Sequence, residues 1–461
     1  MRIRSIKRFI PLGVTLAVFI SLFVLFISRN SPPEVVVQLS PRHASYFEIH
    51  RKQQQYTDKY FSQTGELINV RINDKPGASE PKIVANPLKK DVFAVVSNDF
   101  SSLGSAAVFI TEDGGSSWLR SQIPLSVIAG DMFYADPWAA YDSKGSLAYI
   151  TVAMRSTEYS RNIVFNISND NGRSWLKHPV TVKTFESKDV KFDKPKILFG
   201  DNDELYVLWI EAAPDKRDVS FCVSNDHGKS FTDSRVIASG DIHFADVILE
   251  NGILYLVYSD GETINVKTSA DSGTTWSEPA MVTSYDQYST LNKQPAIKVD
   301  GDRGVRVNSD PQAIVSNGRM FITYGAKPAN GDLSEVYFVS GDLNSLVFTV
   351  SKAVSNAGSD KFLPALTKDD SGNIYILYYS SENDPDNLLT EMYLASTADF
   401  GNTFTYKNLS TEKFNPHEIV VEKSYMGDYI SLAVNNGKLV GVWTDGRNES
   451  MDLMAGIVSL K

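Results

Sequence analysis

The stretch Ser224-Asn225-Asp226-His227-Gly228-Lys229-Ser230-Phe231 recurs along this chain with small changes. The shared pattern is Ser/Thr-x-Asp-x-Gly-x-Ser/Thr-Trp/Phe, and its other copies lie at residues 111–118, 168–175, 269–276 and 397–404. A pattern that returns at wide spacing indicates a fold built from repeats. The aspartates that we expect to hold these turns are Asp113, Asp170, Asp226, Asp271 and Asp399.

Each residue of this pattern has a physical reason to be in a turn. The aspartate can accept hydrogen bonds from N–H groups of the turn, and the glycine can take a positive φ. The aromatic residue at the end can pack into the core of the sheet. We therefore interpret the pattern as structural, placed between the third and fourth strands of a repeating unit.

Two further features recur in step with this turn. A short apolar strand starts after an acidic residue or beside a proline, as in Glu80-Pro81 and Asp136-Pro137, and seven such starts are present. A turn such as Asn317-Gly318 then leads into a second apolar strand, which is a strong hairpin signal. Four short strands per unit predict an all-β fold, a seven-bladed β-propeller, with six blades as the alternative. The last unit lacks its outer strand, and residues 66–72 are predicted to supply it and close the ring.

Composition excludes several classes of function. The 461-residue chain has a net charge of −10, which disfavours nucleic acid as a partner. Its one cysteine, Cys222, lies in an apolar run and is expected to be a buried thiol. A single cysteine permits no disulfide within the chain.

The N-terminus differs from the rest of the chain. Residues 1–8 are basic, and residues 9–27 form an apolar run long enough to nearly span a bilayer. We interpret this run as an uncleaved signal anchor, with the N-terminus in the cytoplasm and the propeller outside. A cleaved signal and a secreted protein are the alternative. Residues 28–64 are predicted to be a spacer and 65–461 the propeller.

The repeated turns resemble the BNR, or Asp-box, repeats of the sialidase (neuraminidase) superfamily, over roughly residues 66–461. The chain is also similar to bacterial extracytoplasmic sialidase-like propellers, through Gly427-Asp428-Tyr429 and the run from Val442 to Arg447. The resemblance implies a glycan or glycoside ligand. Sialidases use three arginines, a tyrosine nucleophile supported by a glutamate, and an aspartate acid/base. Where their first arginine is expected, this chain has Glu80, which would repel a carboxylate substrate.

The starts of the first strands should meet at the mouth of the central tunnel. Five of the seven carry a carboxylate, and Lys194 and Leu363 interrupt the series. Crowded carboxylates raise one another's pKa, which suits acid/base hydrolysis of a glycoside. A cation such as Ca²⁺ is an alternative occupant, and no other cofactor is expected. A purely structural role, capping backbone turns, is a third possibility. The five carboxylates are Glu80, Asp136, Asp246, Asp310 and Asp428.

Loops on the same face add basic and acidic residues. Arg447 is the candidate for a positioned arginine, with a structural ion pair to Asp445 as the alternative. The catalytic candidates are therefore Asp136, Asp428, Arg447, Glu80 and Asp310. The candidates for ligand binding are Asp246, Arg303, Arg306, Arg155 and Asp445. The rival hypothesis is a non-catalytic scaffold that binds a protein partner, because fold alone does not determine function.

Overall fold

The structure, a computed structural model, describes residues 61–64, 67–101, 105–124, 133–156, 159–185, 189–292, 294–301, 303–328, 331, 333–349, 352–355, 358–419 and 425–460. They lie within one compact unit, Gln53–Lys461. The predicted basic segment 1–8, the anchor 9–27 and the spacer up to residue 60 lie outside the described residues. Within the described ranges, no helix has the length and apolar character needed to cross a membrane.

The described chain is built almost entirely of antiparallel strands, with one short 3-10 helix, η1 (Pro416–Glu418). Six sheets each contain four strands that follow one another in sequence. The first three of these sheets comprise β3 (Ala78–Ala85), β4 (Phe93–Asp99), β5 (Ser105–Thr111) and β6 (Leu119–Ser121); β7 (Phe133–Tyr141), β8 (Leu147–Ser156), β9 (Tyr159–Ser168) and β10 (Val180–Thr184); and β11 (Lys191–Phe199), β12 (Leu205–Ala212), β13 (Arg217–Ser224) and β14 (Arg235–Gly240).

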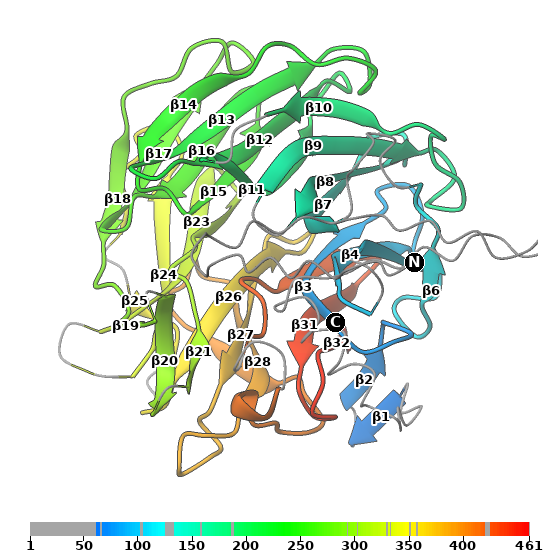
Figure 1. The fold of residues 1–461 in the computed structure, drawn as a ribbon. Coiled ribbons are helices and arrows are strands. Elements are labelled where there is room, and N and C mark those ends of the chain that lie inside the picture. The colour runs from blue at the N-terminus through cyan, green and yellow to red at the C-terminus, as the bar shows by residue number, and fades with distance from the viewer. Residues whose placement is uncertain are drawn as a thin grey trace, which may run out of the picture. The chain divides into compact units, whose positions relative to one another are not determined.

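The other three four-stranded sheets follow the same order (Figure 1). They comprise β15 (Phe244–Glu250), β16 (Ile253–Ser259), β17 (Thr263–Ser269) and β18 (Ala280–Ser284); β22 (Gln312–Ser316), β23 (Arg319–Ala326), β24 (Glu335–Asp342) and β25 (Lys352–Ala353); and β26 (Lys361–Lys368), β27 (Ile374–Ser380), β28 (Glu391–Thr397) and β29 (Thr405–Asn408).

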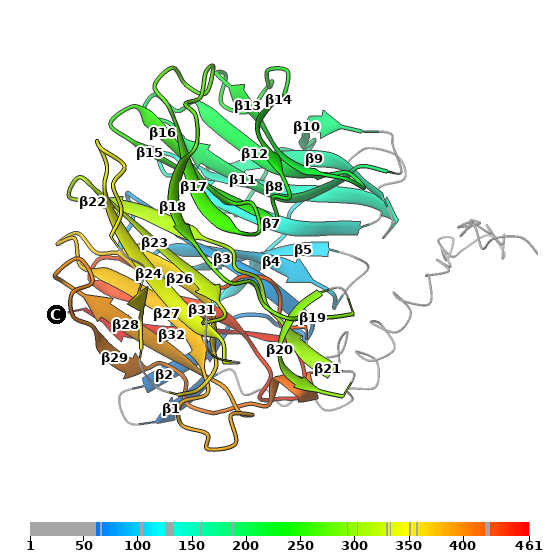
Figure 2. The same cartoon turned by 90° about the vertical axis from the view of Figure 1, so that its left-hand side faces the viewer.

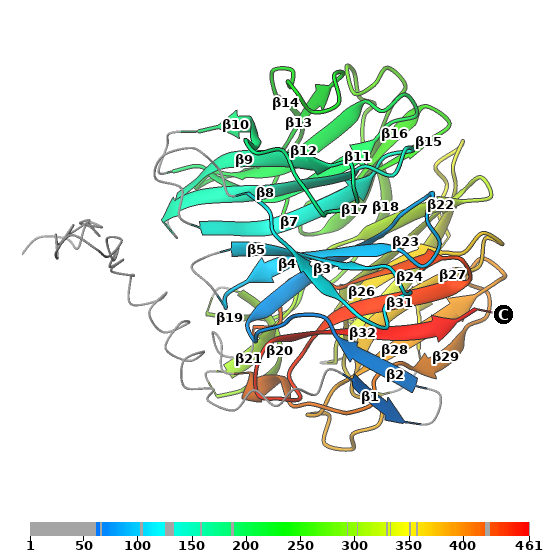
Figure 3. The ribbon, with the colours of Figure 1, turned by 90° about the vertical axis from the view of Figure 1, so that its right-hand side faces the viewer.

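The last sheet joins the two ends of the described chain. It holds β30 (Ser431–Asn435), β31 (Lys438–Asp445) and β32 (Asp452–Ser459), and β2 (Leu67–Arg71) pairs with β32. Figure 3 shows β2 alongside β32 at this seam. The prediction that residues 66–72 supply the missing strand is confirmed. A further strand, β1 (Phe61–Thr64), pairs with β2, so regular structure begins within the predicted spacer.

One small sheet was not predicted. Between β18 and β22 the chain forms β19 (Thr290–Leu291), β20 (Gln294–Asp300) and β21 (Arg303–Arg306), a three-stranded sheet that lies beside the larger ones in Figure 2. Strand β21 contacts η1. This insertion carries Arg306, and it therefore brings an arginine to the unit from outside the four-stranded sheets.

The first strands of the larger sheets contact one another in sequence order. Contacts run from β3 to β7, β11, β15, β22, β26 and β30, and β30 contacts β3 in turn. Sheets that meet through their first strands and close on themselves form a β-propeller, and closure removes free sheet edges.

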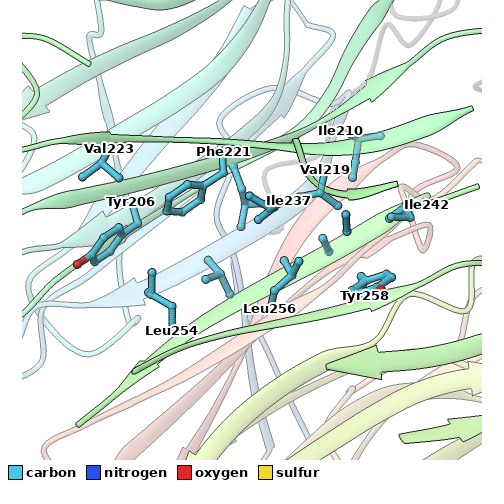
Figure 4. Close-up of a cluster of buried hydrophobic side chains, with 14 residues drawn as sticks. Tyr206, Ile210, Val219, Phe221, Val223, Ile237, Ile242, Leu254, Leu256 and Tyr258 are labelled. Carbon is cyan, nitrogen blue, oxygen red and sulfur yellow. The ribbon is translucent and has the colours of Figure 1, made fainter. Parts of the chain in front are cut away.

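Apolar side chains fill the space between neighbouring sheets. In the cluster of Figure 4, Phe221 on β13 and Leu256 on β16 lie between the sheets β11–β14 and β15–β18, and both are fully buried. Burial of each such side chain contributes about 1.5–3 kcal/mol. Cys222 is also fully buried, as expected for a structural thiol. The sheets are thus held together by the apolar side chains that alternate along their strands, and this packing does not involve the polar groups at the strand ends.

The repeated turns close on themselves. In the copy at residues 224–231, Asp226 accepts hydrogen bonds from Ser230 N (2.9 Å), Ser230 Oγ (2.5 Å) and Ser224 Oγ (2.8 Å). These bonds lower the pKa of Asp226 to about 2. The same contact with the residue four positions on recurs at the other four aspartates, Asp113, Asp170, Asp271 and Asp399. Each of the five aspartates is therefore hydrogen-bonded within its own turn.

Candidate functional site

The starts of four first strands are kinked in the same way, at Glu80, Asp136, Lys194 and Leu363. Glu80, Asp136 and Lys194 have φ values of 56°, 52° and 47°, in the left-handed region that non-glycine residues rarely adopt. Each stands at a break in strand register and precedes a proline. Such bulges re-aim side chains and are common beside functional sites. We call the cluster that Glu80, Asp136 and Lys194 form with Asp310, Asp428, Arg306 and Tyr425 the mouth cluster.

Hydrogen bonds join the mouth cluster across three sheets and the segment that leads into a fourth. Asn98 on β4 donates to Glu80 Oε2 (2.7 Å) and accepts from the backbone N of Asp136 (2.8 Å). Asp136 Oδ2 in turn accepts from the backbone N of Lys194 (3.4 Å). Glu80 Oε1 also accepts from the backbone N of Asp428 (2.9 Å). The cluster exists only because the ring brings these sheets together.

Two cations lie among the carboxylates. Lys194 Nζ is 3.0 Å from Asp310 Oδ2 and 3.3 Å from Asp428 Oδ2, and all three side chains are at most 8% exposed. Arg306, from the inserted β21, places Nη2 2.5 Å from Asp428 Oδ2. The sequence interpretation treated Lys194 as a break in an acidic ring. In the structure it supplies the positive charge that allows two buried carboxylates to lie side by side.

The carboxyl groups of the mouth cluster differ in their proton affinity. Burial, and then the charges of Asp193 and Glu80, raise the pKa of Asp136 well above its ordinary value. Burial and the charge of Asp428 raise the pKa of Glu80 as well. Burial opposes ionisation of Asp428 too, but Arg306 and Lys194 hold its pKa below the ordinary value. Groups whose environments separate their pKa values in this way are suited to acid and base roles.

A tyrosine and a glutamate are paired in this cluster. The Tyr425 hydroxyl donates a short hydrogen bond to Glu80 Oε1. The Arg306 guanidinium lies over the Tyr425 ring, 5.2 Å from its centroid. The Nε of Arg306 is buried and has no hydrogen-bond partner among the described residues. Burial raises the pKa of Tyr425 well above its ordinary value, so its hydroxyl needs a base in order to react.

A cavity of about 100 Å³ adjoins the mouth cluster. Asp310 is the shared wall, and the other side chains on it include His243, Tyr285, Tyr288 and Asn308. Burial and the charge of Arg217 lower the pKa of His243, which favours its neutral form. The cavity therefore offers hydroxyl, amide and imidazole groups beside the carboxylates, which suits a ligand rich in hydroxyl groups.

Inside the ring, below the mouth cluster, lies a second polar group. Lys196 Nζ is 3.1 Å from Asp246 Oδ1, 3.6 Å from the centroid of the Phe244 ring and 4.4 Å from that of Trp138. Lys82 Nζ also lies 4.4 Å from the Trp138 centroid. Burial lowers the pKa of Lys196 to about 8. Asp246, predicted to bind ligand, is thus paired with a buried lysine.

The other predicted site residues lie away from the mouth cluster or have side chains outside the described residues. Arg447 forms two 2.8 Å bonds with Asp445 and a 2.9 Å bond with Thr411, and its side chain is 4% exposed. It also donates to Asn69 of β2 (3.2 Å), which fits the structural alternative of an ion pair at the closing sheet. The side chains of Arg155 and Arg303 lie outside the described residues. Roles for these residues in catalysis or binding stay predictions.

Sequence reasoning missed Tyr425 and Asn98. Tyr425 lies three residues before Asp428, within a loop that carries no repeat signal. Asn98 is the next-to-last residue of β4, a second strand, and carries no repeat signal of its own. The spacing between Tyr425 and Glu80 is 345 residues, so their contact follows only from ring closure. Only the adjacency of Tyr425 to Gly427-Asp428 gave a signal that could have found it.

A metal site is not evident in the described part of the chain. Across those residues, no three histidine, cysteine, aspartate or glutamate side chains are grouped to hold a metal ion. Lys194 lies between the carboxylates where the sequence suggested Ca²⁺. The calcium site stays a prediction.

Comparison with known proteins identifies the fold. No protein-family model matches the chain, and no curated protein matches it. A solved ulvan lyase of polysaccharide lyase family PL25, bound to a GlcA(1-4)Rha3S unit, is 12% identical with a TM-score of 0.53, over 85% of this chain and 96% of that one. The chain has a β-propeller fold. At this identity the likeness shows the fold alone.

Two other solved structures are similar at lower scores. A sialidase from Trypanosoma rangeli is 14% identical with a TM-score of 0.48, over 86% of this chain and 58% of that one. An alpha-L-arabinofuranosidase from Fusarium graminearum is 15% identical with a TM-score of 0.44, over 71% and 93%. TM-scores below 0.5 carry no argument about this chain, so the chemistry has to come from its own residues.

Proposed function

We propose that this protein binds a glycan at the mouth cluster and hydrolyses a glycosidic bond. The observation that carries the proposal is the pairing of Tyr425 with Glu80, beside a second carboxyl group, Asp136, that burial and nearby charge favour in its protonated form. A nucleophile with its own base and a separate general acid are what retaining glycoside hydrolysis requires.

In the first step, the Tyr425 hydroxyl oxygen attacks the anomeric carbon, and Glu80 takes the phenolic proton. The bond from that carbon to the leaving oxygen breaks, and Asp136 donates a proton to the leaving group. The raised pKa of Glu80 makes it a stronger base, and that of Asp136 keeps a proton available. Arg306, over the tyrosine ring, stabilises negative charge on the hydroxyl oxygen.

In the second step, water attacks the same carbon, and Asp136, now ionised, takes its proton. The tyrosyl oxygen leaves and recovers its proton from Glu80. The tyrosyl oxygen and then the water thus attack the anomeric carbon from opposite faces. The two inversions leave the product with the configuration of the substrate.

The charge of the mouth cluster favours an uncharged or amino sugar. Lys194 and Arg306 are both paired with Asp428, and Glu80 stands where a sialidase would place an arginine. A substrate carboxylate would meet further carboxylates there. Among described side chains, Arg306 is the arginine that contacts the Tyr425–Glu80 pair, so the three-arginine arrangement of sialidases has one counterpart.

The experiment is turnover of p-nitrophenyl glycosides by the full-length protein. Tyr425→Phe and Asp136→Asn should each lower kcat at least about 100-fold. A 2,4-dinitrophenyl leaving group needs little protonation, so it should restore much of the activity of Asp136→Asn and none of that of Tyr425→Phe. Asp226→Asn, in a repeated turn, is the matched control and should leave kcat unchanged.

The scaffold hypothesis is supported by one observation. The mouth cluster is largely satisfied by its own hydrogen bonds and ion pairs, which is also what a purely structural cluster would show. Absence of turnover across a panel of neutral, amino and acidic glycosides would favour it. Turnover that neither Tyr425→Phe nor Asp136→Asn affects would contradict the roles assigned here.

Three structural proposals accompany this function. The closed circuit of first-strand contacts supports seven blades, with β19–β21 as an insertion between the fourth and fifth. The apolar run at residues 9–27 supports a single-pass anchor with the propeller outside the cytoplasm. The repeated turns support membership of the Asp-box propellers. Protease accessibility of intact cells would test the second of these, since an external propeller should be degraded.

A further inference from the structure

One repeated turn has lost its pattern, at residues 341–348. The Thr349 hydroxyl accepts from Ser340 N (3.1 Å), just as the Thr232 hydroxyl accepts from Val223 N (3.1 Å) in an intact copy. This equivalence places Gly341 where Ser224 stands and Leu343 where Asp226 stands. The bonds that close an intact turn therefore cannot form here.

A cavity of about 380 Å³ lies beside this altered turn. Buried Phe338 and Ser340 contribute to its lining, together with Arg319, Lys352, Phe400 and Asn402. Its volume is within the range of about 300–1,000 Å³ that is typical of small-molecule sites. It lies between the sheets β22–β25 and β26–β29, at the ends of the strands opposite to the mouth cluster.

The polar groups of this cavity are mainly positive. Arg319 donates to Ser340 Oγ (3.1 Å), and its Nε is buried without a hydrogen-bond partner among the described residues. Lys352 lies 5.5 Å from the Phe404 ring centroid. Asp342 is the cross-strand neighbour of Arg319, and its carboxylate accepts bonds from Asn344 N and Ser345 N of its own turn. The bonds from Ser345, and after them the charge of Arg319, lower the pKa of Asp342.

Sequence register shows that the positive charge is particular to this sheet. Arg319 comes just before the residue that pairs with Gly341. In the intact copy, Leu205 pairs with Ser224, and the residue just before Leu205 is Glu204. The neighbouring turn contributes Phe400 where Ser272 stands in another copy, and Phe400 is 45% exposed with Arg319 5.5 Å from its ring centroid. Loss of the turn pattern, a reversed charge and an exposed aromatic ring thus coincide at one place.

We propose that this cavity binds an acidic saccharide, with Arg319 and Lys352 on its carboxylate or sulfate group. A buried N–H without a partner costs free energy, which an oxyanion would relieve. The Phe400 ring supplies an apolar wall for the sugar, and Asn402 and Thr349 supply groups for its hydroxyls. The site is independent of the mouth cluster, and it would hold a chain on the opposite face without cleaving it.

The test is isothermal titration calorimetry of the full-length protein with tetragalacturonate, cellotetraose and sodium sulfate. Tetragalacturonate should bind more tightly than cellotetraose, and its affinity should fall with added salt. Arg319→Met and Lys352→Met should each weaken it about tenfold, the effect expected for a charged hydrogen bond. Lys229→Met, an exposed lysine in an intact turn, is the control and should change nothing.

Phe400→Ala separates a saccharide site from a simple anion site. It should weaken tetragalacturonate and leave sulfate binding unchanged. Binding of sulfate without tetragalacturonate, equal binding of the neutral tetramer, or affinity that neither cation affects would each overturn the proposal. If Arg319→Met proves unstable by thermal unfolding, Arg319→Lys keeps the charge but loses the planar fork, and it should still weaken binding.

Discussion

The two ends of the strands surround their carboxylates differently: the Asp226 side chain is exposed in its turn, whereas Glu80 is buried at the mouth. A repeated turn satisfies its aspartate with neighbours within four residues, and the pKa of Asp226 falls to about 2. In the mouth cluster, Glu80 accepts a bond from the backbone N of Asp428 and Asp136 accepts one from that of Lys194, residues distant in the chain, and there the pKa values rise. Local satisfaction stabilises the charged form, whereas burial at the mouth opposes it. The first arrangement gives stability, and the second gives groups that can exchange protons.

The largest effect is expected when the mouth cluster loses its central anion. Asp428→Asn leaves Lys194, which is 8% exposed, with Asp310 alone and leaves Arg306 without its ion-pair partner. Breaking one partner of a buried pair costs about 3–5 kcal/mol. Urea unfolding at pH 7 measures this loss. A loss below about 1 kcal/mol would mean that water, and not Asp428, balances these cations.

The link between sheets can be removed without changing charge. Asn98→Ala deletes the bonds to Glu80 and to the Asp136 backbone, and Asn98 is 3% exposed. Leaving buried groups without partners costs about 1–3 kcal/mol each, so we expect about 2–4 kcal/mol in urea unfolding. Asn344→Ala, exposed in the altered turn, is the control. Equal stability of the two variants would show that Asn98 does not join the sheets.

Asp136→Asn should raise stability at pH 7 by on the order of 1 kcal/mol, while it removes the proposed general acid. The folded pKa of Asp136 lies above its ordinary value of 3.8, so the ionised group is penalised at high pH and not at low pH. The gain of the variant should therefore shrink as pH falls toward 4. Thermal unfolding at pH 7, 5 and 4 measures it, and a destabilised variant at pH 7 would contradict the assigned proton affinity.

Asp226→Asn should show the smallest effect and the opposite sign. Its folded pKa of about 2 lies below the ordinary 3.8, so its stabilisation is present above pH 3.8 and is lost as pH falls toward 2. The variant should melt slightly below the wild type at pH 7 and together with it near pH 2. A difference that persists unchanged at pH 2 would show that the turn does not depend on the charge.

Much of the fold could be predicted because its signals are local. The turn pattern, the hairpin signals and the strand alternation each act within about ten residues, and they identified the repeated turns, the first strands and the closing strand. The insertion β19–β21 and the strand β1 were missed because neither follows the repeat. Their sequences resemble ordinary loop and spacer segments.

The candidate site was predicted only in part. Glu80, Asp136, Asp310 and Asp428 were found through their shared position at strand starts, and the structure brings them together. Arg447 was ranked above Arg306 because it lies near Asp445 and Asp428 in sequence. In the folded chain Arg447 pairs with Asp445, while Arg306 reaches Asp428 from an insertion 122 residues away.

The sequence by itself determined the repeat, the turns and the class of residue at each strand start, because these depend on backbone geometry and on neighbours close in the chain. The tertiary structure decided which charges meet. Lys194 became the partner of two carboxylates, and Tyr425 the partner of Glu80, because ring closure places strand starts from distant units side by side. The pKa of a side chain depends on its burial and on such neighbours, and neither can be predicted from the sequence of a single repeat.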